Sequence, residues 1–257
     1  MNVPKAEQDA YDRRPLHERI AADLRDEIMS GDLPPGASLP STQRLKDRFE
    51  ASNATVQKAL QVLKDERLVV GRAGASVTVR EHRQETIRPA DTGQPAPPGE
   101  QYSWLTVASR RGKRGSIELV DVAEVQPPAD VTAALGLAEG ETAVMRSQVL
   151  SYDDVPVELV KSYYPVELAR GTAMAERRKI RGGTPALLAE MGYPPRNTVD
   201  RVSARVPTQE QFEALQLPSG LPVLRTFRVV YSDGERPIEV TVMAKAGHLY
   251  ELQYEFV

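Results

Sequence analysis

The chain has 257 residues, with 33 lysines and arginines against 36 aspartates and glutamates, which gives a formal net charge of −3. It contains no cysteine, which excludes disulfides, thiolate nucleophiles, iron–sulfur clusters and cysteine-containing zinc sites, and its three histidines are scattered. The sequence lacks an apolar run long enough to cross a membrane, and its polar start lacks the apolar core of a secretory signal. We therefore expect a cytoplasmic protein with no bound metal or cofactor and no contact with a membrane.

The charge is unevenly distributed along the chain. Residues 1–40 contain five basic and eight acidic residues, whereas residues 41–80 contain eight basic and four acidic residues. A local basic surface can attract the phosphates of a nucleic acid although the whole chain is acidic. The net charge therefore does not exclude a nucleic-acid partner.

A proline-rich segment separates two regions with regular apolar patterns. Between residues 83 and 101 the apolar periodicity is lost, and four prolines and two glycines occur. Proline favours a semi-extended spacer that holds two domains apart. We predict domains at residues 12–82 and 102–257, joined by a linker at residues 83–101.

Three helices are predicted at the start of the first domain. Every fourth residue from Leu16 to Ile28 is apolar, which indicates a helix over about residues 16–30 that ends at Gly31. The Pro-Pro-Gly turn that follows cannot continue a helix. A second, short helix is predicted after Ser41, and a third is predicted after Ser52, whose hydroxyl can cap it.

The third predicted helix carries a polar face. Val56, Leu60 and Leu63 mark its inner side, so that Asn53, Ala54, Gln57, Lys58 and Gln61 point outward. Asparagine and glutamine can pair with adenine in the major groove, whereas arginine favours guanine. Such a face on an isolated helix is usually only solvated. Here two short strands follow at residues 69–79, with Arg72 at their turn, and this order is typical of a winged helix-turn-helix.

A specific motif lies between the first and second predicted helices. Residues Gly31 to Ser41 have the pattern Gly-x-Leu-x-x-Gly-x-x-Leu-Pro-Ser. With the helices around this motif, residues 15–80 resemble the DNA-binding domain of the GntR family of bacterial transcription regulators. The resemblance implies DNA contacts from the start of the second helix, from the third helix and from the wing. The predicted DNA-binding residues, from this resemblance and from the helix pattern, are Ser41, Thr42, Gln43, Arg44, Ser52, Asn53, Ala54, Thr55, Gln57, Lys58, Arg72 and Gly74.

The chain departs from the common pattern of that family at two places. The family has Glu-Arg-Glu where Thr42-Gln43-Arg44 stands, and arginines where Asn53 and Gln57 stand. Because these arginines provide the usual guanine contacts, we expect the operator of this chain to differ from the common one.

The second domain is predicted to be rich in strands. Alternating patterns occur at residues 117–125, 142–150, 155–164, 199–206, 223–231, 237–245 and 249–256, and helices are expected to start near residues 184 and 208. Residues 134–158 also resemble residues 214–239, with Arg146 matching Arg225 and Glu158 matching Glu239. We predict two copies of a helix and a β-hairpin, paired about a pseudo-twofold axis around a pocket, although chance similarity of two hairpins is the alternative.

Three phrases give the second domain its own resemblance: Val160 to Pro165, Ile180 to Thr184 and Pro237 to Thr241. With these phrases, residues 102–257 resemble the UTRA effector-binding domain of the HutC branch of the GntR family, whose fold is similar to chorismate lyase. The chain is thus expected to be an α+β protein, with an N-terminal winged helix-turn-helix, a proline-rich linker and a chorismate-lyase-like antiparallel sheet domain. The resemblance implies effector contacts at Arg146, Gln148, Glu158, Thr184, Glu239 and Lys245.

These polar residues have a purely structural alternative. Arg146 with Glu158, and Arg225 with Glu239, are spaced so that they can form cross-strand ion pairs. The family members that bind phosphorylated sugars have a second arginine where Gln148 stands and an aromatic residue where Lys245 stands. A sugar phosphate is therefore not a safe assumption for the effector.

The main hypothesis from the sequence is a dimeric repressor without enzymatic activity. It would bind a palindromic operator in double-stranded DNA, and a small-molecule effector of unknown identity would change its affinity. One alternative is a repressor that needs no ligand, as in the control of plasmid transfer. Another is a lyase-like enzyme, which the absence of a recognisable catalytic constellation discourages.

Overall fold

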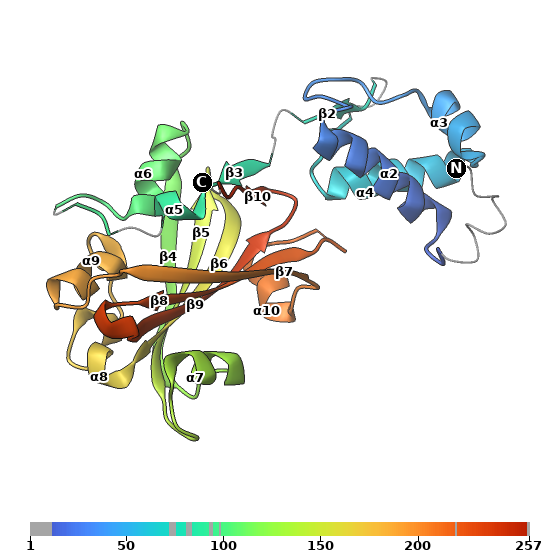
Figure 1. Cartoon of the computed structure of the whole chain (residues 1–257). Coiled ribbons are helices and arrows are strands. Elements are labelled where there is room, and N and C mark those ends of the chain that lie inside the picture. Colours follow the sequence, from blue (N-terminus) through green and yellow to red (C-terminus); the bar gives the residue numbers. More distant parts are fainter. Residues whose placement is uncertain are drawn as a thin grey trace. The chain divides into compact units, whose positions relative to one another are not determined.

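The computed structural model describes residues 12–71, 76–80, 84–92, 95–97, 99–218 and 220–255. The chain divides after Gln84 into two units, the second of which starts at Glu85. The labels in Figure 1 follow the chain order of the helices and strands.

The first unit contains the three predicted helices. The apolar stripe of the first helix ends where Gly31 takes φ = 91°, a left-handed conformation that glycine adopts without steric cost. The second and third helices are capped by Ser41 and Ser52, whose side chains accept hydrogen bonds from the backbone amides of Arg44 and Thr55. The elements are α2 (Leu16–Ser30), α3 (Thr42–Phe49), α4 (Asn53–Asp65), β1 (Val69–Val70) and β2 (Thr78–Val79).

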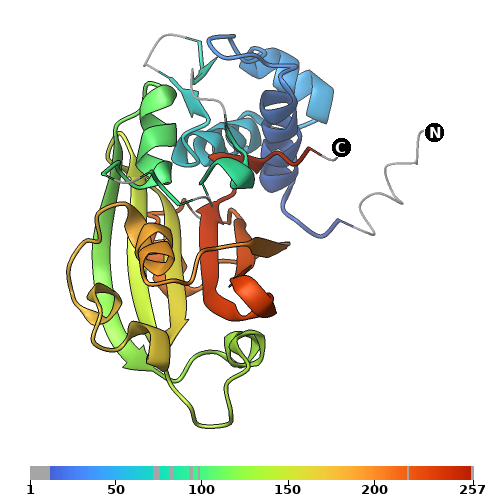
Figure 2. The same ribbon diagram turned by 60° about the vertical axis from the view of Figure 1, so that its left-hand side comes forward.

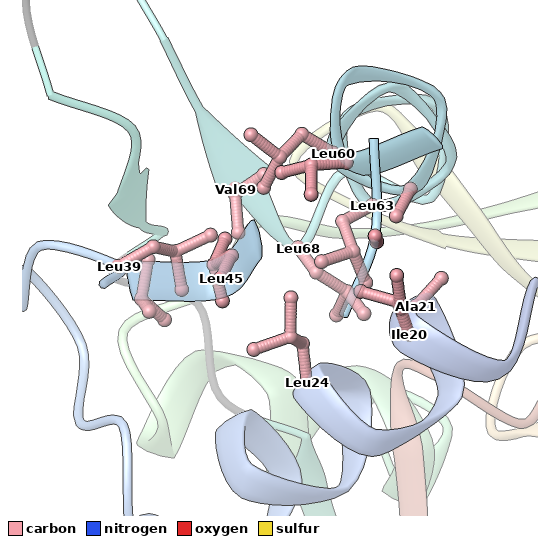
Figure 3. Packing of buried hydrophobic residues seen from close by; sticks show 13 residues of the cluster. Ile20, Ala21, Leu24, Leu39, Leu45, Leu60, Leu63, Leu68 and Val69 are labelled. Carbon is pink, nitrogen blue, oxygen red and sulfur yellow. The ribbon is translucent and has the colours of Figure 1, made fainter. Parts of the chain in front are cut away.

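The core of this unit is formed where the three helices meet the two short strands. Figure 3 shows Leu24 of α2, Leu45 of α3 and Leu63 of α4 turned toward one another, and all three are fully buried. Burying a leucine side chain contributes about 1.5–3 kcal/mol, so this cluster holds α4 in place. Strands β1 and β2 pair antiparallel, as predicted for the wing, but residues 72–75 between them lie outside the described residues.

The second unit is built on a six-stranded antiparallel sheet in the described part of the chain. Its strand order is β4-β5-β6-β9-β8-β7, and its strands can be followed in both Figure 1 and Figure 2. They correspond to the first six predicted strands, with bounds that differ by at most two residues. They are β4 (Gly115–Val125), β5 (Ala143–Tyr152), β6 (Val155–Pro165), β7 (Asn197–Arg205), β8 (Val223–Tyr231) and β9 (Pro237–Ala246).

Helices cover both faces of this sheet. On one face, α7 (Ala129–Leu135) and the residues after α10 (Gln209–Ala214) pack on apolar side chains such as Phe227 and Leu159. On the other face lie α6 (Ser103–Arg110), α8 (Val166–Ala169), the 3-10 turn η1 (Ala173–Ala175) and α9 (Gly183–Glu190). A further 3-10 turn, η2 (Asp233–Glu235), joins β8 to β9. The second face carries most of the polar residues that the sequence singled out.

The segment predicted as a linker differs from the structure. Residues 85–101 belong to the second unit, where β3 (Glu85–Ile87) pairs in parallel with β10 (Tyr250–Leu252) and is followed by α5 (Pro89–Thr92). This pairing joins residues 165 positions apart, which no local pattern signals. The seventh predicted strand, at residues 249–256, is correspondingly reduced to β10 among the residues described.

The sheet confirms the internal repeat and corrects its register. The units β4-α7-β5-β6 and β7-α10-β8-β9 occupy symmetric places, with β6 and β9 side by side at the centre. The register of β6 and β9 is compatible with the predicted match of Glu158 with Glu239, both of which line the cavity. With this match, the strand registers make Arg146 equivalent to Thr226 instead of Arg225. A shift of one residue along a strand moves the side chain to the opposite face, so Arg225 lies on the other side of the sheet, where it pairs with Asp130.

Candidate nucleic-acid interface and ligand cavity

Helix α4 presents an exposed polar face beside its buried one. Val56, Ala59 and Leu63 are fully buried, whereas Asn53, Ala54, Gln57, Lys58 and Gln61 are exposed. The side chains of Asn53, Gln57 and Lys58 form no hydrogen bond with any described residue, so their donors and acceptors are free for another molecule. This is the arrangement that a helix in the major groove requires.

The two capping serines have local roles as well as exposed positions. Ser41 accepts a hydrogen bond from the Arg44 amide at 3.3 Å, and Ser52 accepts one from the Thr55 amide at 3.1 Å. The Ser52 and Thr55 hydroxyls are also 2.8 Å apart. A helix amino terminus carries free amides and a partial positive charge, which favours phosphate. Ser41 and Ser52 therefore cap two such termini, and both serines are exposed.

The start of α3 contributes further polar groups. Gln43 and Arg44 are exposed, and Thr42 is partly exposed. The Gln43 amide donates a hydrogen bond to Asp47 at 2.7 Å, so this amide is engaged within its own helix. The two predicted wing residues, Arg72 and Gly74, lie outside the described residues.

An ion pair fixes the far end of α4. Arg25 of α2 donates two hydrogen bonds to the carboxylate of Glu66, from Nε at 2.8 Å and from Nη2 at 2.5 Å. The Glu66 side chain is only 3% exposed. A bidentate arginine–carboxylate pair has a defined geometry, so it orients the end of α4 relative to α2.

The second unit encloses a cavity of about 420 Å³ on the helix-covered, polar face of the sheet. Alternate residues of β5, β6, β8 and β9 form most of its floor, with further residues from β4 and β7, and α6, α9 and the segment before α9 form its walls. All six predicted effector residues line it: Arg146, Gln148, Glu158, Thr184, Glu239 and Lys245. A volume of this size suits a small organic molecule.

The floor of the cavity is organised in rows that cross the strands. One row, from β5 to β7, consists of Arg146, Ser162, Thr241, Arg228 and Asp200. Sequence reasoning singled out only the first of these residues. Alternation along β9 indicates that Thr241 shares a face with Glu239 and Lys245. No local sequence signal indicated which face of the sheet lines the cavity.

Arg146 is buried and bound to backbone oxygens. Its Nη1 donates to the carbonyls of Met174 and Glu176 at 2.8 and 2.9 Å, with a longer bond of 3.3 Å to Ala173, and its Nη2 donates to Arg178 at 2.7 Å. Burial lowers the pKa of this guanidinium below its ordinary value. The expected alternative, an ion pair with Glu158, does not form. Arg146 instead anchors the 173–178 segment to the sheet.

Glu158 and Lys245 form a buried ion pair across the centre of the sheet. They face each other in the register of β6 and β9, with 2.7 Å between Lys245 Nζ and Glu158 Oε1, and each side chain is 6% exposed. On the neighbouring strands Arg228 donates two hydrogen bonds of 2.8 Å to Asp200. Burial opposes the charge of Arg228, but the hydrogen bond and charge of Asp200 raise its pKa overall.

Glu239 is buried without a cationic partner among the described residues. The hydroxyls of Ser162 and Thr241 donate to its Oε1, the first at 3.2 Å and the second at 2.5 Å. Burial raises the pKa of this carboxyl, against the opposing effects of the Thr241 and Ser162 hydroxyls and the Arg228 charge. The second expected ion pair, between Arg225 and Glu239, is therefore also absent.

Two further features of the cavity wall were missed from the sequence. Thr226 is 1% exposed, lines the cavity, and has a hydroxyl with no hydrogen-bond partner among the described residues. Tyr102 lies against Gly183, where an added Cβ would come within 2.5 Å of the tyrosine ring. The Tyr164 hydroxyl donates to Thr184 at 2.8 Å, so the start of α9 is tied to the cavity floor.

No helix in the described residues has both the length and the apolar character needed to cross a membrane.

Comparisons with known proteins agree on the nature of both units. Residues 16–79 match the family of bacterial regulatory proteins called gntR, and residues 110–251, more than half of the chain, match the UTRA domain. An HTH-type transcriptional regulator of Streptomyces coelicolor is 28% identical over 95% of this chain and 93% of its own length. The HTH-type transcriptional regulator GgaR of Escherichia coli is 26% identical over 94% of this chain and 91% of its own length.

A solved structure shares the fold of the whole chain. PhnF from Mycobacterium smegmatis aligns with 93% of this chain and 99% of its own, with a TM-score of 0.56 and 22% sequence identity. The winged helix with its exposed recognition face, the enclosed cavity and both family matches lead to the same assignment. The chain belongs to the GntR family of bacterial regulatory proteins, in the branch with a UTRA domain, and is a DNA-binding transcription regulator with a C-terminal ligand-binding domain.

Proposed function

We propose that this regulator is a dimeric repressor whose affinity for a palindromic operator is changed by a small molecule bound in the cavity of the second unit. Two copies would place their α4 helices in successive major grooves on one side of the DNA. The half-sites would then lie about one helical turn, ~34–36 Å, apart. Effector binding would favour a dimer arrangement that no longer fits this spacing.

The exposed face of α4 is the observation that carries the proposal. Asn53 and Gln57 are exposed and bear unbonded amides, and Lys58 adds a positive charge beside them. Amides at these positions favour adenine, so we infer an operator with A·T pairs where the recognition helix lies. Ser41, Thr42, Gln43, Arg44, Ser52 and Thr55 then contact phosphates that set the position of the helix.

The place of the cavity in the chain supports control by an effector. Ile87 and Tyr102, which line the cavity, belong to the first elements that follow the DNA-binding unit in the sequence. A ligand that contacts them acts on the segment through which the two units are connected. The cavity also argues against the ligand-independent alternative, because a module used only for dimerisation has no need of buried polar side chains around a hollow.

The edge of the sheet supports dimerisation through the second unit. Strand β7 is an outer strand of the sheet, and its Val199 and Val202 are 46% and 43% exposed. An exposed edge strand with apolar side chains is a surface that another chain can cover. We infer that the partner is a second copy of this chain, which a measurement of molar mass in solution tests.

The DNA-binding proposal is tested with the full-length protein and the DNA upstream of its own gene. Wild type should retard this DNA at concentrations that leave a random duplex of equal length free. N53A/Q57A should reduce the preference by about tenfold or more, because each bidentate contact to a base is worth about 1–3 kcal/mol.

The control variant is Q209A, which removes another exposed amide, at the start of α10 in the second unit. Its preference should equal that of wild type. Equal binding of upstream and random DNA by wild type, or an unchanged preference in N53A/Q57A, contradicts the proposal. A reporter gene behind the upstream DNA measures the sign of regulation, and expression that rises with the protein rejects the repressor.

A further inference from the structure

Three cationic side chains on the floor of the cavity are engaged within the protein, whereas Lys179 and Arg181 of its wall form no ion pair with a described residue. Arg146 donates to backbone carbonyls, Lys245 pairs with Glu158 at 2.7 Å, and Arg228 is bound by both oxygens of Asp200. An anionic ligand could pair with Lys245 or Arg228 only by displacing Glu158 or Asp200. Breaking a buried pair leaves an uncompensated charge, which costs about 3–5 kcal/mol.

The carboxyl group of Glu239 is in the opposite situation. It lines the cavity and is 8% exposed, yet no described lysine or arginine forms an ion pair with it. The hydroxyls of Ser162 and Thr241 donate to its Oε1, and the Tyr164 hydroxyl also favours its charged form. Glu239 therefore accepts hydrogen bonds from hydroxyls but has no ion-pair partner among the described residues.

Apolar side chains lie along the cavity beyond Glu239. Val160 and Met243 face each other across the central strands, and Leu150 and Ile117 lie in the next row, beside Glu158. Trp104 and Leu105 of α6 form the adjoining wall. Nearer to Glu239, Val230 faces it across β8 and β9 and also lines the cavity, so an apolar part of a ligand bound to Glu239 can pack there.

We propose that the effector is a small molecule with an ammonium or similar cationic group on an apolar body, and that Glu239 accepts the hydrogen bond of this group. This inference rests on the proposed function, because it takes the cavity as the effector site. The cation would replace the missing partner of a buried carboxylate, and such charge-assisted hydrogen bonds are roughly twice as strong as neutral ones. The raised pKa of Glu239 in the absence of a cation agrees with a carboxyl that lacks its partner.

Three probes of nearly equal shape test the proposal on the full-length protein. They are 2-phenylethylamine, 2-phenylethanol and 3-phenylpropionate, which present a cation, a neutral hydroxyl and an anion on the same apolar body. Inorganic phosphate is the fourth. Calorimetric titration should give the amine a dissociation constant about tenfold or more below that of the alcohol, a difference of about 1.4 kcal/mol, with weaker or no binding of both anions.

The variant Glu239→Gln keeps the shape of the side chain and an acceptor for Ser162 and Thr241. In E239Q the amine should lose its advantage and bind within about twofold of the alcohol. The control is Glu139→Gln, which removes an exposed carboxylate outside the cavity and should keep the preference for the amine.

Several results would overturn the proposal. They are tighter binding of the acid or of phosphate than of the amine, a preference for the amine that survives in E239Q, and binding of none of the probes. The ranking of the four probes on wild type alone suffices if E239Q does not fold. A wrong ranking with intact recognition of the upstream DNA refutes only the cationic effector, whereas loss of that recognition refutes the proposed function.

Discussion

The Glu158–Lys245 pair gives a prediction whose size follows from the structure. The two charged atoms are 2.7 Å apart, and both side chains are 6% exposed, so neither charge is well solvated. K245M leaves Glu158 buried without a partner and should destabilise the second unit by about 3–5 kcal/mol. E158Q/K245M removes both charges and should restore most of this loss, because replacement of a whole buried pair by neutral groups is often close to neutral.

Urea unfolding followed by tryptophan fluorescence measures this effect in the right unit. Trp104 is the single tryptophan of the chain, is 4% exposed and stacks on Tyr152 with 4.7 Å between ring centroids. With a urea dependence of about 2 kcal/mol per molar, K245M should move the midpoint down by on the order of 2 M. Equal midpoints for K245M and E158Q/K245M would refute the reasoning, since the two charges would then not be coupled.

Three further predictions concern single side chains. S52A removes the cap of α4 and should destabilise the first unit by about 1 kcal/mol, seen as earlier loss of helical circular dichroism in urea, and an unchanged transition would speak against the cap. Gly183 and Gly192 both have a positive φ, of 80° and 87°, but a Cβ at Gly183 would lie 2.5 Å from the Tyr102 ring, whereas a Cβ at Gly192 would meet no atom within 4 Å. G183A should therefore lower the free energy of unfolding more than G192A, and equal losses would show that the ring moves aside. Burial raises the pKa of Glu239 above its ordinary value of 4.5, so the folded protein binds more protons at this group than the unfolded chain does. Wild type should therefore lose stability relative to E239Q as the pH rises above 4.5. A difference in unfolding free energy that stays constant with pH would contradict this.

The first unit could be predicted closely from the sequence because its signals are local. The apolar stripe from Leu16 to Ile28, the glycine that ends it and the two capping serines each act within one helix. The same stripe pattern on α4 separated the buried residues from the exposed ones. DNA contacts themselves stay predictions, because they depend on a partner that the sequence does not contain.

The second unit was predictable in its strands but not in its long-range contacts. Alternation located the strands of the large sheet, whereas β3 was hidden because its partner β10 comes at the other end of the unit and prolines dominate the local composition. Arg146 looked like a partner of Glu158 by spacing alone, but its acceptors lie on the 173–178 segment. The predicted match of Arg146 with Arg225 was wrong by one residue, because the residue equivalent to Arg146 is Thr226. Two like residues in a repeat do not determine the strand register.

The near-symmetry of the sheet determines how a ligand can be recognised. Two identical halves would offer a bound molecule a pair of equivalent poses, head to tail and reversed. Different residues at equivalent positions of the two halves make the poses unequal. Thr226 occupies the position equivalent to Arg146, and Lys245 occupies the position equivalent to Tyr164. Only the carboxylates Glu158 and Glu239 are duplicated, and Lys245 neutralises one of them. The cavity therefore has two different ends although the sheet is nearly symmetric, and a charged group of a ligand is expected at the Glu239 end.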